Sequence, residues 1–231
     1  MVSLRLGDLA PDFEAACFFP AEANNAAFEH KIKFSDFCAD SWVILFSHPA
    51  DFTPVCTTEL ARVAQLKEAW EERNCRVLAL STDSVNVHSA WMGDVNEFAG
   101  SGHSVFYPVI ADVDLKVSSL YGMLDEVTAQ GTATPALPIR TVFVLDPHRR
   151  IRLTISYPAA VGRNFDEILR ALDALQRTDA YKIALPADWK AGDRAIVRFD
   201  VQDDEADRLF QDIDRVKPYL RFVPDPKQHQ Q

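Results

Sequence analysis

Cys56 lies where a cysteine can become a reactive thiolate, inside the first turn of a predicted helix. Thr53 suits the N-cap of that helix, and Pro54 suits its first position because the missing N–H costs nothing there. Unpaired backbone N–H groups and the positive end of the helix dipole favour an anionic sulfur, and can lower the pKa of a thiol from about 8.5 into the range of roughly 3.5 to 7.5. The predicted chemistry is nucleophilic attack by Cys56 at neutral pH.

The elements around Cys56 are those that present a reactive group in an α/β protein. The apolar run 41–47 predicts a buried strand, and residues 48–52 form a short loop after it. A helix over 54–72 is then predicted by apolar residues at helical spacing, namely Leu60, Val63, Leu66 and Trp70. A strand, a loop and a helix N-terminus in this order form a common cradle for catalytic groups.

The segment around Cys56 resembles the active-site segment of peroxiredoxins, whose pattern is Pro, three residues, Thr, two residues and Cys. Pro49, Thr53 and Cys56 match this pattern within FSHPADFTPVCTTEL, residues 46–60. The His-Pro start and the Thr-Thr-Glu-Leu end are similar to the one-cysteine, peroxiredoxin 6-like class. Four further segments resemble that class in the same order: RTVFV (140–144), SYPA (156–159), GRNFDEILR (162–170) and PADWKAGD (186–193).

This resemblance implies a thiol peroxidase that reduces hydrogen peroxide and alkyl or other organic hydroperoxides to water or alcohol. Cys56 would attack one peroxide oxygen and become a sulfenic acid. The Thr53 hydroxyl would face the same pocket, and Pro49 would shield the sulfur. Arg140 would lower the pKa of the thiol and bind the peroxide. The alternatives are that Thr53 is only an N-cap and that Arg140 forms an ordinary surface salt bridge.

Three more residues are supporting candidates by the same resemblance. His48 and Glu59 would stand behind the residues that touch the peroxide, and Arg163 would orient Glu59 or the loop. A histidine beside a proline-containing loop is also commonly a polar residue with its hydrogen bonds satisfied, so a direct role for His48 has a structural alternative. The five other histidines are dispersed without ligand-like spacing, so no metal is expected, and no cofactor is implied.

The remaining cysteines, Cys17, Cys38 and Cys75, are expected to be reduced thiols with packing roles. No Cys-x-x-Cys pair is present, and no cysteine follows Cys75. An internal resolving thiol in the C-terminal half is therefore missing, and a thiol transferase is disfavoured. An external donor must reduce the sulfenic acid, and glutathione, a thioredoxin-type protein and ascorbate remain open.

Alternating strand and helix patterns predict an α/β fold. The resemblance implies a thioredoxin-like core with a small C-terminal dimerisation domain. We place the peroxidase domain at 1–177 and the C-terminal domain at 178–231, and expect a homodimer, with a higher oligomer possible. Residues 141–145 and 151–157, joined by a turn, are expected to pair as a hairpin.

Composition sets limits on the partners. The chain has 231 residues and a formal net charge of −10, which argues against nucleic acid or an anionic membrane as the main partner. No apolar run approaches the roughly 20 residues that span a bilayer, and residues 1–8 do not resemble a signal or transit peptide. We expect a cytoplasmic protein without a membrane partner.

Two further functions were weighed. Some members of the class are described as phospholipases with a Gly-x-Ser-x-Gly-like motif, but here that segment is Ala39-Asp40-Ser41-Trp42-Val43, without either glycine. We expect no robust phospholipase activity and a structural Ser41. The other alternative is a redox-regulated chaperone or signalling partner that is switched by oxidation of Cys56.

Overall fold

The structure is a computed structural model that describes residues 4–20, 30–125, 131 and 137–226. The chain divides into two compact units, Met1–Phe165 and Asp166–Gln231, and each is described by itself. The division lies at the first residue of helix α7 (Phe165–Ala180), whereas the expected domain boundary after residue 177 falls inside that helix. Among the described residues, no helix combines the length and the apolar character needed to span a bilayer.

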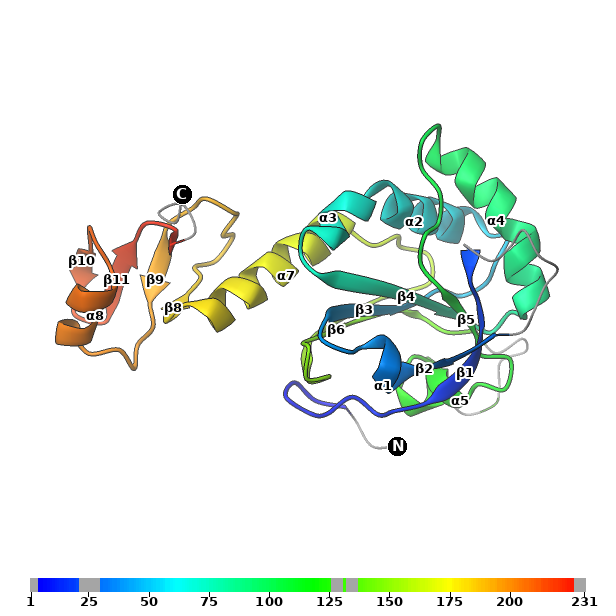
Figure 1. Cartoon of the computed structure of the whole chain (residues 1–231), viewed down its shortest axis with the longest axis horizontal. Coiled ribbons are helices and arrows are strands. Elements are labelled where there is room, and N and C mark those ends of the chain that lie inside the picture. The colour runs from blue at the N-terminus through cyan, green and yellow to red at the C-terminus, as the bar shows by residue number, and fades with distance from the viewer. Residues whose placement is uncertain (1–3, 21–29, 126–130, 132–136, 227–231) are drawn as a thin grey trace. The chain divides into compact units, whose positions relative to one another are not determined.

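The described part of the first unit is built on a seven-stranded mixed sheet with the order β2-β1-β5-β4-β3-β6-β7 (Figure 1). Strand β3 runs parallel to β4 and antiparallel to β6, and the central strand β4 also runs parallel to β5. The strands are β1 (Glu14–Phe18), β2 (His30–Lys33), β3 (Trp42–Ser47), β4 (Cys75–Ser81), β5 (Val109–Ala111), β6 (Arg140–Leu145) and β7 (Ile151–Tyr157).

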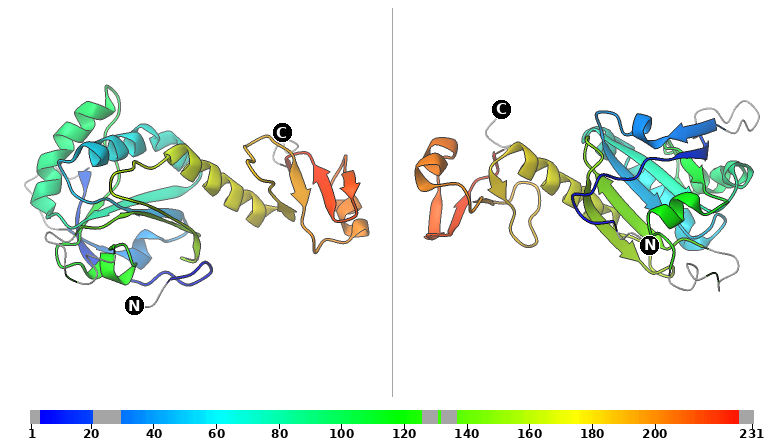
Figure 2. Two further views of the ribbon diagram at one scale, coloured as in Figure 1. Left: turned by 180° about the vertical axis from the view of Figure 1, so that it is seen from behind. Right: turned by 90° about the horizontal axis from the view of Figure 1, so that it is seen from below.

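Helices cover both faces of this sheet. Helices α2 and α4 lie over one face, and α1 and α5 lie over the other (Figures 1 and 2). The alternating side chains of β3 explain the two layers: Val43 and Leu45 enter a core cluster with residues of α1 and α5. The helices of this unit are α1 (Phe34–Phe37), α2 (Pro54–Gln65), α3 (Lys67–Glu71), α4 (Val85–Ala99) and α5 (Lys116–Leu120).

The catalytic helix is shorter than the sequence predicts. Instead of one helix over 54–72, α2 ends at Gln65 and α3 begins at Lys67. Leu66 between them has φ −94° and ψ 16°, outside the helical region. Trp70 stays buried despite this break, and its indole N–H donates to the carbonyl oxygen of Val63 at 3.3 Å. The apolar spacing of the sequence therefore continues across two helices. The prediction of a single helix was therefore wrong at Leu66.

The sequence predicts the strands at one edge of the sheet but not those at the other. The expected hairpin is confirmed, since β6 and β7 pair antiparallel. The sequence patterns do not predict strands β1 and β2, and Cys17 lies in β1 opposite His30 of β2 and Ile110 of β5. The sequence of β1 does not alternate clearly between apolar and polar residues, and its burial pattern is correspondingly mixed. A strand was therefore hard to predict there.

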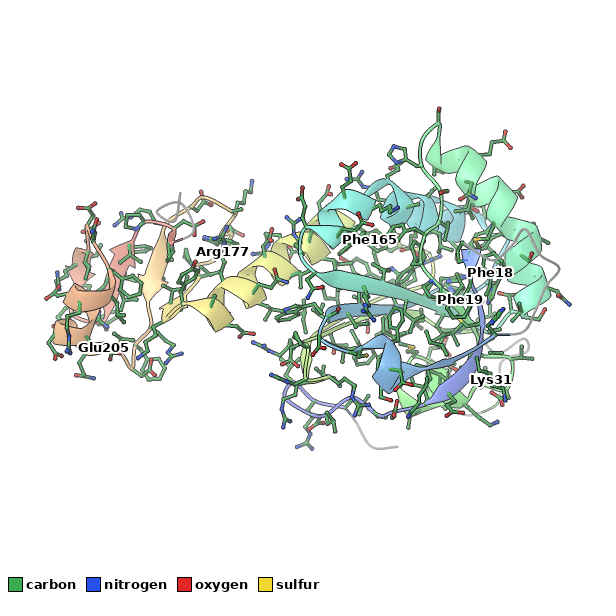
Figure 3. The ribbon with its side chains drawn as sticks, viewed as in Figure 1. Phe18, Phe19, Lys31, Phe165, Arg177 and Glu205 are labelled. Carbon is green, nitrogen blue, oxygen red and sulfur yellow. The ribbon has the colours of Figure 1, made fainter. Side chains whose placement is uncertain are left out.

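The second unit contains a long helix and a small antiparallel sheet, which in the described residues has four strands in the order β10-β11-β9-β8. Its core includes Ile183, Val197 and Val223, and the guanidinium of Arg177 lies 5.3 Å from the ring centroid of Trp189. Figure 3 marks Arg177 on α7 and Glu205 on α8. The elements after α7 are β8 (Ile183–Ala184), β9 (Ala195–Val197), α8 (Asp203–Leu209), β10 (Asp214–Lys217) and β11 (Leu220–Val223).

Candidate active site

Cys56 occupies the third position of α2, as the sequence predicts. Thr53 is the N-cap residue and Pro54 the first residue of the helix. The Cys56 side chain is fully buried, with 0% of its surface exposed. Its sulfur accepts a hydrogen bond from Nη1 of Arg140 at 3.3 Å. A helix N-terminus and a guanidinium therefore act on the same sulfur atom.

The buried guanidinium of Arg140 donates hydrogen bonds to three different residues. It is the first residue of β6, which pairs with β3, and is 3% exposed. Its Nε and Nη2 both donate to the carbonyl oxygen of Ala159, at 2.8 and 2.6 Å. Its Nη1 donates to Oε2 of Glu59 at 2.7 Å as well as to Cys56. The guanidinium is thus buried and fixed, and the alternative of a surface salt bridge is excluded.

Glu59, one turn after Cys56 on α2, joins Arg140 to a second arginine. Arg163 donates to its carboxylate from the backbone N at 2.8 Å, from Nε at 2.9 Å and from Nη2 at 2.6 Å. Burial by itself would raise the pKa of Glu59, but the hydrogen bonds and charge of Arg163, with the charge of Arg140, outweigh it and leave that pKa below its usual range. Glu59 is therefore a carboxylate at neutral pH.

Arg163 connects this cluster to the two strands beneath it. Its Nη1 donates to the carbonyl oxygens of Ser47 in β3 and Thr141 in β6, at 2.8 and 3.3 Å. Its guanidinium also lies 4.8 Å from the ring centroid of Phe46 and 5.6 Å from that of Phe165, which Figure 3 marks at the start of α7. Burial lowers the pKa of Arg163 from its ordinary value, although an arginine stays charged after such a change.

The charges in this cluster do not balance without the sulfur. Arg140 and Arg163 carry two positive charges and Glu59 carries one negative charge, and all three side chains are buried. Burying an unpaired charge is unfavourable, so a buried group that supplies one negative charge stabilises the set. The sulfur of Cys56, in contact with Arg140, is the buried atom placed beside this excess of positive charge.

The loop before α2 positions Thr53 and Pro49. The hydroxyl of Thr53 donates to the carbonyl oxygen of Ala50 at 2.8 Å and makes no capping hydrogen bond to the helix. Because its hydrogen is committed to Ala50, the hydroxyl can only accept a further hydrogen bond. Phe52 has φ 54°, an uncommon backbone conformation for a bulky residue and a form of local strain that gathers at functional sites. Pro49 is buried in the same loop.

His48 has a different set of partners from the arginine cluster. Its Nε2 lies 2.8 Å from Oδ1 of Asp51, and its ring centroid lies 5.6 Å from that of Trp91 on α4. The other oxygen of Asp51 lies 2.6 Å from Nδ1 of His88, also on α4. Asp51 and His88 were missed from the sequence. The available signal was the placement of His88 on the apolar face of α4 that carries Trp91, where a histidine needs a buried partner.

The other thiols differ from Cys56 in their surroundings. All four cysteines lie in described residues and are free. Burial raises the pKa of Cys38 to about 12, and burial also raises the pKa of Cys17 and of Cys75 well above the ordinary value of a thiol. All three are buried and free, as the predicted packing roles require. The hydroxyl of Ser41 is also buried and donates to Oδ1 of Asn74 at 3.3 Å.

In the described residues, no three His, Cys, Asp or Glu side chains are grouped in a way that could hold a metal ion.

Comparison with known families assigns both parts of the chain. Residues 6–154 match the AhpC/TSA family, and residues 174–210 match the C-terminal domain of 1-Cys peroxiredoxin. Peroxiredoxin-6 of Gallus gallus is 44% identical over 98% of this chain and 100% of its own length. The chain belongs to the one-cysteine peroxiredoxins.

Other relatives agree with this assignment of the peroxiredoxin. The 1-Cys peroxiredoxin of Dictyostelium discoideum is 45% identical over 96% of this chain and 86% of its own length. Among solved structures, a variant of peroxiredoxin 6 of Arenicola marina is 40% identical, with a TM-score of 0.87 and coverage of 97% of this chain and 100% of that one. The fold is therefore the expected thioredoxin-like α/β core with a C-terminal domain.

Membership in this family establishes the activity. The protein is a thiol-dependent peroxidase, an oxidoreductase that reduces peroxides with electrons from thiols and serves in antioxidant defence. The structure of a yeast mitochondrial 1-Cys peroxiredoxin, 39% identical with a TM-score of 0.82 over 96% of this chain and 99% of its own, is described as showing thiol resolution through glutathione and thioredoxin systems.

Proposed function

We propose that Cys56 is the nucleophile of the peroxidase and that Arg140 activates it. The observation that carries this proposal is the hydrogen bond of 3.3 Å from Arg140 Nη1 to a buried sulfur at the third position of α2. The Cys56 thiolate attacks one oxygen of the peroxide, and the O–O bond breaks. The other oxygen leaves as water or alcohol after it gains a proton, and Cys56 becomes a sulfenic acid.

The surrounding residues then have distinct roles. Arg140 stabilises the charge that develops on the peroxide oxygens, because its position is fixed before the reaction by Ala159 and Glu59. Glu59 and Arg163 are positioning residues that hold Arg140. Thr53 accepts a hydrogen bond from the peroxide, since its own hydrogen is used on Ala50.

Pro49 and His48 complete the loop that precedes the helix. Pro49 shields the sulfur from bulk water, which its buried place in the loop supports. His48 supports the loop through its contacts with Asp51 and Trp91. The reductant reacts with the sulfur of Cys56 and with neither of these residues.

An external donor completes the cycle. Of the four cysteines, only Cys56 has the surroundings of a reactive thiol, while Cys17, Cys38 and Cys75 are buried with raised pKa values. We favour glutathione or a thioredoxin-type protein over ascorbate, because the related yeast structure is described with both thiol systems. Steady-state turnover with each of the three donors in turn distinguishes them.

Stopped-flow reaction of the reduced protein with less than one equivalent of hydrogen peroxide or an alkyl hydroperoxide tests the nucleophile. The wild type should consume one peroxide per chain and give one sulfenic acid, trapped with dimedone and located by mass spectrometry, and Cys56→Ser should abolish both. Arg140→Lys keeps the charge but not the planar fork, and should slow the reaction by about 10²–10³-fold. Arg150→Lys, an exposed arginine, is the matched control. Equal slow reaction in the wild type and Cys56→Ser would instead favour the chaperone or signalling role.

We also propose that the enzyme is a cytoplasmic homodimer. The proposal of a dimer rests on the match of residues 174–210 to the C-terminal domain of 1-Cys peroxiredoxin, and the second unit also exposes Phe199 at 89% and Tyr219 at 76%. The four free cysteines suit a reducing compartment. Sedimentation velocity at micromolar concentration should give the mass of a dimer, and a stable monomer would contradict it. Fractionation of the source cells tests the compartment.

A further inference from the structure

The loop between β3 and α2 holds a buried histidine with one unused nitrogen. His48 has 0% of its surface exposed, and its Nε2 lies 2.8 Å from Oδ1 of Asp51. Among the described residues, its Nδ1 has no hydrogen-bond partner. A buried polar atom without a partner is uncommon, and a catalytic role is one of the explanations for it.

Asp51 lies between two histidines. Its second carboxylate oxygen, Oδ2, lies 2.6 Å from Nδ1 of His88, whose Nε2 lies 3.2 Å from the carbonyl oxygen of Ile110. His88 is also fully buried. Burial would raise the pKa of Asp51, but the hydrogen bonds to His48 and His88 outweigh it and keep that pKa below its ordinary value. Asp51 is therefore a carboxylate.

The partners determine where the hydrogens lie. A carboxylate and a carbonyl oxygen only accept hydrogen bonds, so each ring nitrogen that faces one of them must carry a hydrogen. Both nitrogens of His88 face such acceptors, which makes His88 an imidazolium. Only Nε2 of His48 faces an acceptor, so a neutral His48 with a lone pair on Nδ1 satisfies the cluster.

We propose that His88 is a positioning residue: it carries the positive charge that balances Asp51 and so keeps His48 neutral, with Nδ1 as a free acceptor in the loop that leads to Cys56. Without that charge, His48 would be the counter-ion of Asp51 and would be protonated on Nδ1. The consequence for catalysis rests on the proposed role of Cys56, whereas the protonation state of His48 does not.

Other charged groups near His48 do not supply this balance. Asp83 accepts from the backbone N of Asp51 and from the Ser81 hydroxyl, and adds negative charge. Arg163 donates to the carbonyl of Ser47, the residue before His48, but its charge is already engaged with Glu59. His88 is thus the group whose positive charge contacts Asp51 directly.

Nuclear magnetic resonance of the full-length wild type tests the protonation states directly. Long-range ¹⁵N–¹H correlation spectra of protein labelled at its six histidines report which ring nitrogens carry hydrogen, with His48→Gln and His88→Gln used for assignment. At pH 7 we expect a neutral His48 protonated on Nε2 and a doubly protonated His88. An imidazolium at His48 or a neutral His88 in the wild type would overturn the proposal.

His88→Asn then separates charge from hydrogen bonding. The asparagine amide can still donate to Asp51 but carries no charge, and His103→Asn, at an exposed histidine, is the control. We expect the His48 spectrum of His88→Asn to become that of an imidazolium at pH 6. Its peroxide reaction should slow by roughly tenfold or more at that pH, because a protonated Nδ1 cannot accept a hydrogen bond.

Two outcomes contradict the proposal in different ways. If His48 stays neutral in His88→Asn, then His88 does not set its protonation. If His48 becomes charged but the reaction rate and its pH profile stay those of the wild type, the acceptor is not used in catalysis. A loss of the peroxidase proposal itself would show instead as an unreactive wild type, whatever the spectra report.

Discussion

Glu59 is the residue on which two buried arginines depend, because its carboxylate contacts both Arg140 and Arg163 at 2.7 Å or less. Breaking a buried charge cluster by removing one member typically costs about 3–5 kcal/mol, since the remaining charges lose their partner. The effect should therefore reach both the stability of the first unit and the position of Arg140. A single carboxylate links folding to catalysis here.

We predict that Glu59→Gln lowers the thermal midpoint at pH 7 and slows the peroxide reaction, whereas Glu68→Gln, at an exposed glutamate, does neither. Because the pKa of Glu59 is lower in the folded protein, its stabilisation is fully present above the unfolded pKa of about 4.3. It is lost as the pH falls through the folded value. The difference in midpoint between the wild type and Glu59→Gln, followed by calorimetry, should shrink below about pH 4, and a constant difference would contradict this.

At the scale of elements, local sequence patterns predicted where helix α2 begins, but not the contacts between distant segments. Thr53, Pro54 and Cys56 mark the start of α2 through capping and proline geometry, so the position of the thiol was predictable. The link between Arg140 and Cys56 joins residues 84 positions apart and came from family resemblance, not from a local pattern. His88 was missed because its partner Asp51 lies 37 positions away, in a different element.

A variant of Thr53, the residue before α2, distinguishes a role in catalysis from a purely structural role. Thr53→Val keeps the size of the side chain but removes the hydroxyl that bonds Ala50 at 2.8 Å. We expect a loss of stability of about 1 kcal/mol and a peroxide reaction slower by roughly 10- to 100-fold. Thr58→Val is a matched control. The exposed Thr58 hydroxyl also donates to a backbone carbonyl three residues earlier, that of Val55, at 2.7 Å. Equal effects of the two variants on rate would show that Thr53 is only structural.

On the scale of the whole molecule, the four thiols of one chain should differ sharply in their fate under excess peroxide. Cys56 contacts a guanidinium, whereas burial raises the pKa of the other three thiols and keeps them protonated. No second reactive thiol removes the Cys56 sulfenic acid by forming a disulfide. Without a reductant it persists, and further peroxide converts it to sulfinic and then sulfonic acid.

Graded peroxide without reductant should therefore oxidise Cys56 first, in steps of one oxygen, while Cys17, Cys38 and Cys75 remain thiols. Peptide mass spectrometry of the full chain measures the order, and glutathione or a thioredoxin-type protein added with the peroxide should suppress the higher oxides. Cys56→Ser under the same conditions shows the background at the other cysteines. Oxidation of Cys17, Cys38 or Cys75 ahead of Cys56 would mean that burial does not protect them, and that the contact with Arg140 does not select the reactive thiol.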